Sequence, residues 1–365
     1  MAKKSLATIV MLGDVMLGRI VDEALTVMPN RAAIWGDTLP LLCGGVCTPD
    51  GNGVDPERCL VTGNLECAVT DYPKRAPKTF NFKLSPKNIG ALKEANFKFV
   101  SLANNHILDF FPSGLLETKT VLSKHGIAWA GAGTAQQAEQ PAVIEQLGAK
   151  IAFLSYSDHY KEWAATENQV GVQFINPENY DPTVLKNQLK NASDQADMVI
   201  IFIHWGPNWA WRPSQAIQQL AHDFIDLGGD KIAAVFGHSA HHVQGIEIRA
   251  GKPIIYGSGG FIDDYALDEV YRNDLGFMYC LNLDDQTTSS AALIPRELEL
   301  IPTKITHEWR QPLGSARPPY FSYVNRATGE DKKWLWKKVK TLSAEFGTKV
   351  VEGPRGFKIP LKHVF

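Results

Sequence analysis

The stretch MVIIFIHWGPNWAWRP (198–213), a helix-like run and then IAAVFGHSAHHVQG (232–245) decide the fold of this chain. The apolar part of the first segment ends at His204, and that of the second leads into a histidine cluster, His238, His241 and His242. Short runs rich in Val and Ile, separated by a helical pattern, are typical of buried parallel strands in an α/β sheet. Such sheets bind ligands beyond the carboxyl ends of their strands. We therefore expect the four histidines to meet at one rim of a sheet.

A short apolar run followed by a polar group occurs three more times in the N-terminal half. The polar groups are Asp14, then Glu66, then Asn105 with His106. Carboxylates, amide oxygens and imidazoles together form a mixed oxygen and nitrogen ligand set that suits Mn, Fe, Zn or Co. The recurrence therefore predicts a divalent-metal site where five strand ends meet.

The composition is typical of a soluble globular protein with a large core. The chain has 365 residues, of which 44% are hydrophobic and 21% are charged. Its formal net charge of −2 removes the electrostatic case for nucleic-acid binding. No run approaches the ~18 apolar residues of a membrane-spanning helix, so we expect no membrane span.

The N-terminus and the cysteines indicate a cytoplasmic protein. Two lysines precede the first apolar run, as in a signal peptide, but Asp14 and Arg19 interrupt that run and no small-residue cleavage site follows it. We therefore interpret the run as a first strand. The odd number of cysteines, five, indicates reduced thiols. The four cysteines between positions 43 and 67 lack the paired two-residue gaps of common zinc motifs.

The order of apolar and polar segments indicates one α/β catalytic domain over residues 1–310. A linker, an amphipathic helix and an irregular tail are expected in residues 311–365. Capping residues and periodicity predict helices over residues 19–27, 85–96, 113–125, 182–195, 214–227 and 332–346. Strands are expected over residues 6–12, 59–62, 97–102, 142–147, 150–157, 198–203, 232–236, 243–249, 253–256, 275–283 and 293–305.

Six motifs in this order resemble the CapA family, which is named for capsular poly-γ-glutamate synthesis and is similar to the calcineurin-like metallophosphoesterases. They are GDVMLGR (13–19), GNLE (63–66), ANNHILDF (103–110), HWG (204–206), GHSAHHVQGIE (237–247) and YGSGGFIDDY (256–265). The resemblance covers roughly residues 5–285. It implies a four-layer α/β/β/α sandwich of the metallo-dependent phosphatase type, with the metal site where the strand ends meet.

The resemblance also implies roles for single residues. The metal ligands fall on Asp14, Glu66, Asn105, His204, His238 and His241, and the catalytic histidine falls on His106. Two positions depart from the phosphoesterase pattern. Met16 stands where a histidine ligand is expected, and a thioether is a poor ligand for hard divalent ions. Asn64 stands where a bridging aspartate is expected, so we assign the bridge to Glu66 and expect one or two bound ions.

Three functions fit this pattern. In a hydrolase, a metal-bound hydroxide attacks a phosphoester or acyl centre and His106 protonates the leaving group. In a peptide epimerase, similar to CapA-like enzymes of lasso-peptide biosynthesis, histidines exchange a proton at a Cα atom, and His242 supplies a spare base. The third function is a non-catalytic component of capsule assembly, which is less favoured because no membrane anchor is seen. We favour hydrolysis, with a role in poly-γ-glutamate or capsule metabolism.

The substrate is expected to be a small molecule or a peptide. Arg19 lies just past the first motif, where it can clamp an anionic oxygen with both of its donor groups. The aromatic loop with Trp205, Trp209 and Arg212 can seat a large side chain or a terminal carboxylate. Asn64 and His159, each at a strand end, complete the expected substrate contacts. The identity of the substrate and of the metal, and the oligomeric state, do not follow from the sequence.

Overall fold

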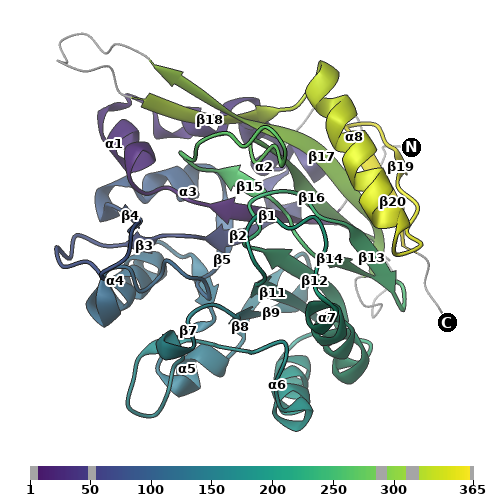
Figure 1. The fold of residues 1–365 in the computed structure, drawn as a ribbon, viewed down its shortest axis with the longest axis horizontal. Coiled ribbons are helices and arrows are strands. Elements are labelled where there is room, and N and C mark those ends of the chain that lie inside the picture. The colour runs from purple at the N-terminus through teal and green to yellow at the C-terminus, as the bar shows by residue number, and fades with distance from the viewer. Residues whose placement is uncertain (1–6, 48–54, 285–293, 310–319, 362–365) are drawn as a thin grey trace.

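Two large β-sheets carry the strand ends that the sequence singles out (Figure 1). A computed structural model describes residues 7–47, 55–284, 294–309 and 320–361. The larger sheet has ten strands, in the order β19 (Val351–Glu352), β20 (Phe357–Pro360), β17 (Ile294–Trp309), β16 (Leu275–Asp284), β1 (Ala7–Val15), β2 (Cys59–Leu65), β5 (Phe97–Ser101) and β6 (Ala128–Ala130), with β15 (Gly260–Ile262) on β1 and β18 (Tyr320–Arg326) on β17.

The smaller sheet has six strands and contains the segment quoted first. Its order is β13 (Ile246–Arg249), β14 (Lys252–Ile255), β12 (Ile232–His238), β11 (Met198–His204), β9 (Ala149–Ser157) and β8 (Ala142–Gln146). β9, β11, β12 and β14 are parallel, as the Val- and Ile-rich runs predict. Two short ribbons pair β10 (Gly171–Val172) with β7 (Ala132–Gly133) and β3 (Ala68–Val69) with β4 (Lys83–Leu84).

The helices begin and end close to the predicted residues where the sequence has a clear capping residue. Asp181 accepts hydrogen bonds from the N–H groups of the first turn of α6, so this helix begins where the sequence predicts. The helix expected over 85–96 is shorter and broken into two pieces. The helical segments are α1 (Ile20–Val27), η1 (Arg31–Thr38), α2 (Leu39–Leu42), η2 (Gly45–Cys47), η3 (Pro56–Arg58), η4 (Pro86–Asn88), α3 (Gly90–Glu94), α4 (Phe111–Lys124), α5 (Ala135–Glu139), η5 (Lys161–Trp163), α6 (Pro182–Gln195), α7 (Gln215–Gly228) and α8 (Gly329–Ala344).

Both sheets are buried on two faces, which explains their continuous apolar runs. In β1, Ile9 and Met11 join a core shared by the two sheets, whereas Val10 and Leu12 pack on the opposite face against helical segments. In β11 alternate residues likewise face the shared core or the outer core that α6 and α7 cover. Alternation with a period of two is what a strand imposes. The α/β fold class expected from the sequence is therefore confirmed.

The C-terminal part of the chain adds to the larger sheet. β18 and β20 both pair with β17, and α8 packs Leu335 and Val339 into the core that the two sheets share. The expected amphipathic helix is thus present as α8, while the linker residues 310–319 lie outside the described residues. Within the described ranges, none of the helices combines the length and the apolar character needed to cross a bilayer.

Substitution of Phe99 on β5, which contacts Phe153 on β9, tests the core between the two sheets. Their rings stack across the two sheets with centroids 4.3 Å apart, and both side chains are fully buried. We expect Phe99→Ala to lower the free energy of unfolding by ~3–5 kcal/mol, because the cavity cannot collapse between two rigid sheets. Chemical denaturation measures this change. The exposed Leu116 of α4 is the control, since Leu116→Ala should change stability by less than about 0.5 kcal/mol. Equal losses in the two variants would contradict the packing described here.

Candidate metal centre

The carboxyl ends of strands from both sheets meet at one place. In the larger sheet Asp14 on β1 lies opposite Asn64 on β2, and in the smaller sheet His204 on β11 lies opposite His238 on β12. The Nδ2 atom of Asn64 is 2.8 Å from Oδ1 of Asp14 and 3.4 Å from Nδ1 of His204. Asn64 therefore links the two sheet edges, and all four side chains are fully buried.

A backbone irregularity aims Asp14 into this meeting point. The register between β1 and β2 shifts between Leu12 and Asp14, so Gly13 is the extra residue of a bulge. A Cβ atom at Gly13 would lie only 1.9 Å from the carbonyl oxygen of Gly259, so a glycine is required here. The bulge and the close approach of β15 together fix the direction of the Asp14 side chain.

Asp14 lies at the centre of the polar cluster. Its Oδ1 atom is 3.6 Å from Nδ1 of His238 and 3.9 Å from Nδ1 of His204. Its Oδ2 atom is 3.0 Å from Nδ1 of His241 and accepts a hydrogen bond from the backbone N–H of Ser239 at 3.3 Å. One carboxylate thus faces the strand-end histidines with one oxygen and the following loop with the other.

Glu66 joins the cluster from the loop after β2. Its two carboxylate oxygens lie 3.8 Å from Nε2 of His204 and 3.9 Å from Nδ1 of His241. Two groups of potential ligand atoms result, Asp14 with His204 and His238, and Asp14 with Glu66 and His241. Within each group the atoms lie within 4.8 Å of one another, which is close enough for a single ion to contact them all. Asp14 belongs to both groups, and Glu66 also reaches toward histidines of both.

Burial sets the charge of these groups in opposite directions. Burial lowers the pKa of His238 to about 4 and that of His204 well below its usual range, so both imidazoles are neutral. Burial, and then the charge of Asp14, raise the pKa of Glu66 well above its usual range. Burial opposes the charge of His241, but Glu66 and Asp14 outweigh it and raise the pKa of His241 to about 9. A metal ligand has to be deprotonated, so His204 and His238 are ready to bind, whereas Glu66 and His241 would release a proton when an ion binds.

Several buried polar atoms of the cluster lack a hydrogen bond. Among the described residues, no partner is found for both carboxylate oxygens of Glu66, Oδ1 of Asn105, and Nε2 of His204 and of His238. Four of these atoms, on Glu66, His204 and His238, lie in the cluster around Asp14, and because buried polar groups are nearly always paired they call for an explanation. The five atoms are carboxylate, amide oxygen and imidazole nitrogen, the donor types that bind divalent transition metals. The residues present therefore fit a divalent ion.

Met16 does not take part in this cluster. Its side chain is fully buried in the core, where Sδ accepts a hydrogen bond from the N–H of Gly18 at 3.2 Å. The sulfur thus serves the turn after β1. The position that the phosphoesterase pattern gives to a histidine is, in this chain, part of the hydrophobic packing.

His106 stands beside the cluster with its own polar support. Its Nδ1 atom is 2.7 Å from Oδ2 of Asp109, and Oδ1 of Asp109 is 2.6 Å from Nζ of Lys78. Lys78 also donates to the backbone carbonyl of Asn105. The ring of Phe82 stacks on that of His106 at 4.0 Å. Because Nδ1 is held by Asp109, Nε2 is left as the ring nitrogen available for proton exchange.

The predicted substrate residues lie in different surroundings. The guanidinium of Arg19 donates two hydrogen bonds to Asp264, of 3.1 and 2.6 Å, so two of its donor groups are already paired with a carboxylate. Trp205 is buried and donates to the carbonyl of Tyr256 at 2.7 Å. Arg212 lies at the surface and pairs with Glu345, just past α8. The structure does not bring Arg19, Trp205 and Arg212 into the cluster around Asp14.

Other predicted residues border the cluster. His159 has Nε2 3.3 Å from Oγ of Ser239, and its ring centroid is 4.9 Å from that of His204. The ring of His242 stacks with that of Trp209 at 6.2 Å, and its Nδ1 atom is 3.2 Å from the carbonyl oxygen of Val243. The ring of His242 contacts aromatic side chains, whereas His241 contacts Asp14 directly. Burial lowers the pKa of His242 to about 4.

Some residues of the site were not singled out from the sequence. Asn104 donates hydrogen bonds to Oδ1 of Asn64 and to the carbonyl of Leu65, and accepts one from the N–H of His106. The ring of Tyr265 lies 5.0 Å from that of His241. Asn104 and Asp109 belong to the quoted motif ANNHILDF, which was a usable signal. No local pattern marks Lys78, because its role depends on how the loop between β3 and β4 folds back beside His106.

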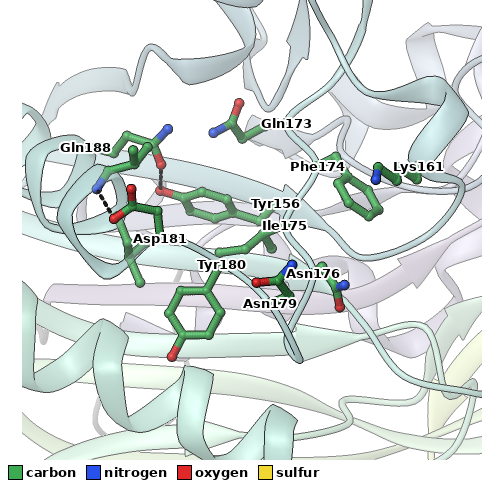
Figure 2. A pocket seen from close by; sticks show the side chains of 12 residues that line it. Tyr156, Lys161, Gln173, Phe174, Ile175, Asn176, Asn179, Tyr180, Asp181 and Gln188 are labelled. Carbon is green, nitrogen blue, oxygen red and sulfur yellow. Dashed lines mark hydrogen bonds between the residues drawn. The ribbon is translucent and has the colours of Figure 1, made fainter.

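A cavity of about 250 Å³ lies between β9 and the segment that leads into α6 (Figure 2). It is lined by Tyr156 of β9 and by side chains of α6 such as Gln188, and the hydroxyl of Tyr156 donates to Oε1 of Gln188 at 3.1 Å. Tyr156 packs in the outer core of the smaller sheet, opposite the core shared by both sheets. None of the potential metal ligands lines this cavity. The metal chemistry is therefore to be sought elsewhere.

Comparisons with known proteins agree with the motifs. The model of the family described as bacterial capsule synthesis protein PGA_cap matches residues 8–265. The chain is 28% identical over 392 residues to the "Probable polyglutamine synthesis accessory protein" of Mycobacterium tuberculosis, covering 95% of this chain and 94% of that protein. It is 27% identical over 344 residues to the "Capsule biosynthesis protein CapA" of Bacillus anthracis, covering 91% and 75%. It is 30% identical over 258 residues to the "PGA biosynthesis protein CapA" of Bacillus subtilis, covering 69% and 62%.

Removal of one imidazole tests the metal centre. We expect His238→Ala to weaken the binding of Mn²⁺, Co²⁺ or Zn²⁺ by at least the roughly 10–100-fold that loss of an outer partner costs a metal site. Isothermal titration and elemental analysis measure this loss and the stoichiometry. His222→Ala is the matched control, because His222 is paired with Glu247 at 2.9 Å and lies outside the cluster. If both variants bind metal like the unmodified protein, His238 is not a ligand.

Proposed function

Because this chain belongs to the bacterial capsule synthesis protein PGA_cap family, the family of the CapA proteins, we propose that it is a metal-dependent hydrolase of a phosphoester or a related bond. The observation that carries the proposal is the cluster of unpartnered buried ligand atoms beside His106. Such a cluster is costly to keep unless the ion it fits takes part in the function. The substrate is expected to be a small molecule or a peptide.

The ion would be held by Asp14, Glu66, Asn105, His204, His238 and His241. When bound, a divalent ion lowers the pKa of water and polarises the oxygen of a phosphoryl or carbonyl group. Because the two groups of ligand atoms share Asp14, the cluster would hold one or two ions. Mn, Fe, Zn and Co all suit this donor set, and elemental analysis distinguishes them.

His106 is proposed to move the proton. Asp109 fixes the orientation of the imidazole through Nδ1, so Nε2 can deliver a proton to the oxygen that leaves. The carboxylate of Asp109 also stabilises the imidazolium form through which this transfer passes. Lys78 holds Asp109 and the carbonyl of Asn105, so it couples the position of His106 to that of a proposed ligand.

A non-catalytic role is the second candidate. The relative from Mycobacterium tuberculosis is named an accessory protein of polyglutamine synthesis, which favours a supporting part in the assembly of an amino-acid polymer. The ordered pair of His106 and Asp109 favours catalysis instead, because assembly alone needs no oriented imidazole. The peptide epimerase and the cytoplasmic location stay predictions from the sequence.

We also propose that the chain adopts the four-layer α/β/β/α arrangement of the metallo-dependent phosphatases. Three hydrophobic cores support it: one shared by the sheets, one beneath α6 and α7, and one on the outer face of the larger sheet. The proposed division places the catalytic domain in residues 1–310 and the appendage in residues 311–365. The pairing of β18 and β20 with β17 makes the two parts neighbours in one sheet.

Substitution of His106 separates catalysis from metal binding. We expect His106→Ala to keep its metal and to lose turnover of a generic aryl phosphate by ~10²–10⁴-fold, the usual worth of a positioned acid or base. Asp109→Asn should show a smaller loss, because the imidazole remains but its orientation is weakened. Metal content by elemental analysis and rates with and without added Mn²⁺ give both readouts.

The assay also decides between the candidate functions. Full activity in the His106→Ala variant would remove the role assigned to this residue. A metal-loaded protein that cleaves no phosphoester or acyl substrate would contradict hydrolysis, and incubation with a peptide in D₂O, read by deuterium at Cα, then tests the epimerase.

A further inference from the structure

A second cavity, of about 550 Å³, opens directly beside His106. One side is formed by the loop between β3 and β4, which carries Lys78 and Phe80. The other side is formed by the segment at η5, which carries Tyr160 and Trp163. His106 is the one potential catalytic residue that lines it. A group bound here would lie beside the imidazole of His106.

The walls of this cavity are aromatic and open to solvent. Phe80 is 57% exposed and Tyr160 is 40% exposed, which is unusual for side chains of this size. The rings of Tyr160 and Trp163 lie 4.9 Å apart. Exposed aromatic side chains that gather around a hollow are typical of a ligand site.

The backbone holds Tyr160 in an unfavourable conformation. Its φ of 55° and ψ of 78° lie in the left-handed region, which bulky residues rarely adopt. The conformation turns the chain into η5, where the N–H of Trp163 donates to the carbonyl of Tyr160 at 2.7 Å. Such strain persists where the surroundings enforce it and is frequent at binding sites. Here it brings both rings to the same wall.

The positive charge of Lys78 in this cavity is already matched by a carboxylate. The ammonium of Lys78 is 2.6 Å from Asp109 and lies 5.1 Å from the ring centroid of Tyr160 and 4.8 Å from that of Trp163. The ammonium of Lys78 is therefore already paired with Asp109 and with the two rings. Glu162 adds a negative charge to the lining. A flat, uncharged group suits this surface better than a second phosphate or carboxylate does.

We propose that this cavity is the subsite for the group that leaves with the proton of His106, and that it takes a flat apolar group such as an aromatic ring. The inference rests on the proposed hydrolase function and specifies the class of its substrate. Hydrolysis of a benzyl phosphate illustrates the step. Water adds its hydroxyl to phosphorus, the P–O bond to the benzyl oxygen breaks, and that oxygen leaves with a proton as benzyl alcohol.

Two substrates with leaving alcohols of similar acidity test the subsite. We expect the metal-loaded protein to cleave benzyl phosphate with a kcat/KM about tenfold or more above that for methyl phosphate. The ratio should fall by about three- to tenfold in Trp163→Leu, the usual worth of an aromatic contact. Tyr160→Asn is a second variant, because asparagine tolerates the left-handed backbone. Trp336→Leu, on α8 and outside the cavity, is the matched control and should keep the ratio.

Binding of analogues that cannot be hydrolysed separates this inference from the proposed function. Benzyl phosphonate should bind the metal-loaded protein more tightly than methyl phosphonate, and Trp163→Leu should reduce the difference. If no ester is cleaved but this binding preference is found, the hydrolase proposal fails and the subsite stands. If neither turnover nor binding distinguishes the benzyl from the methyl compound, the subsite proposal is overturned.

Discussion

The burial of two carboxylates next to each other is the constraint on which the rest of the structure depends. Asp14 and Glu66 are both fully buried, and burial disfavours their charged forms. His241 compensates part of that charge through its contact with Asp14 at 3.0 Å. The carboxylate oxygens of Glu66 have no hydrogen-bond partner among the described residues, so the compensation by protein groups is incomplete. A bound cation would complete it, which is why we propose that the cluster is a metal centre.

The two sheets are needed to assemble this centre. Asp14 lies on β1 and Glu66 follows β2 of the larger sheet, whereas His204 and His238 end β11 and β12 of the smaller one. The core between the sheets, with Phe99 stacked on Phe153, fixes the distance between the two edges. The hydrogen bonds of Asn64 then join the edges directly. Stability and function thus depend on the same contact between sheets.

The sequence was sufficient for most helices and strands and for most of the residues that meet around Asp14, but the tail that it predicts to be irregular forms β19 and β20. Strand ends are recognisable because apolar runs stop at polar groups, and parallel strands place those groups on one edge. The sequence could not assign partners that come from distant segments. Arg19 was expected to bind an anionic oxygen of the substrate. In the structure its guanidinium donates hydrogen bonds to the carboxylate of Asp264, which lies 245 positions away in the sequence. The aromatic loop was expected to seat a substrate, yet Trp205 is directed inward by the carbonyl of Tyr256.

The most direct test of the metal centre is an anomalous difference map from crystals of the protein grown or soaked with Mn²⁺. The account predicts a peak within bonding distance of Asp14, His204 and His238, or between Asp14, Glu66 and His241, with oxygen and nitrogen neighbours only. A map without a peak at Asp14, or with the ion bound at the cysteines or at Met16, would contradict it.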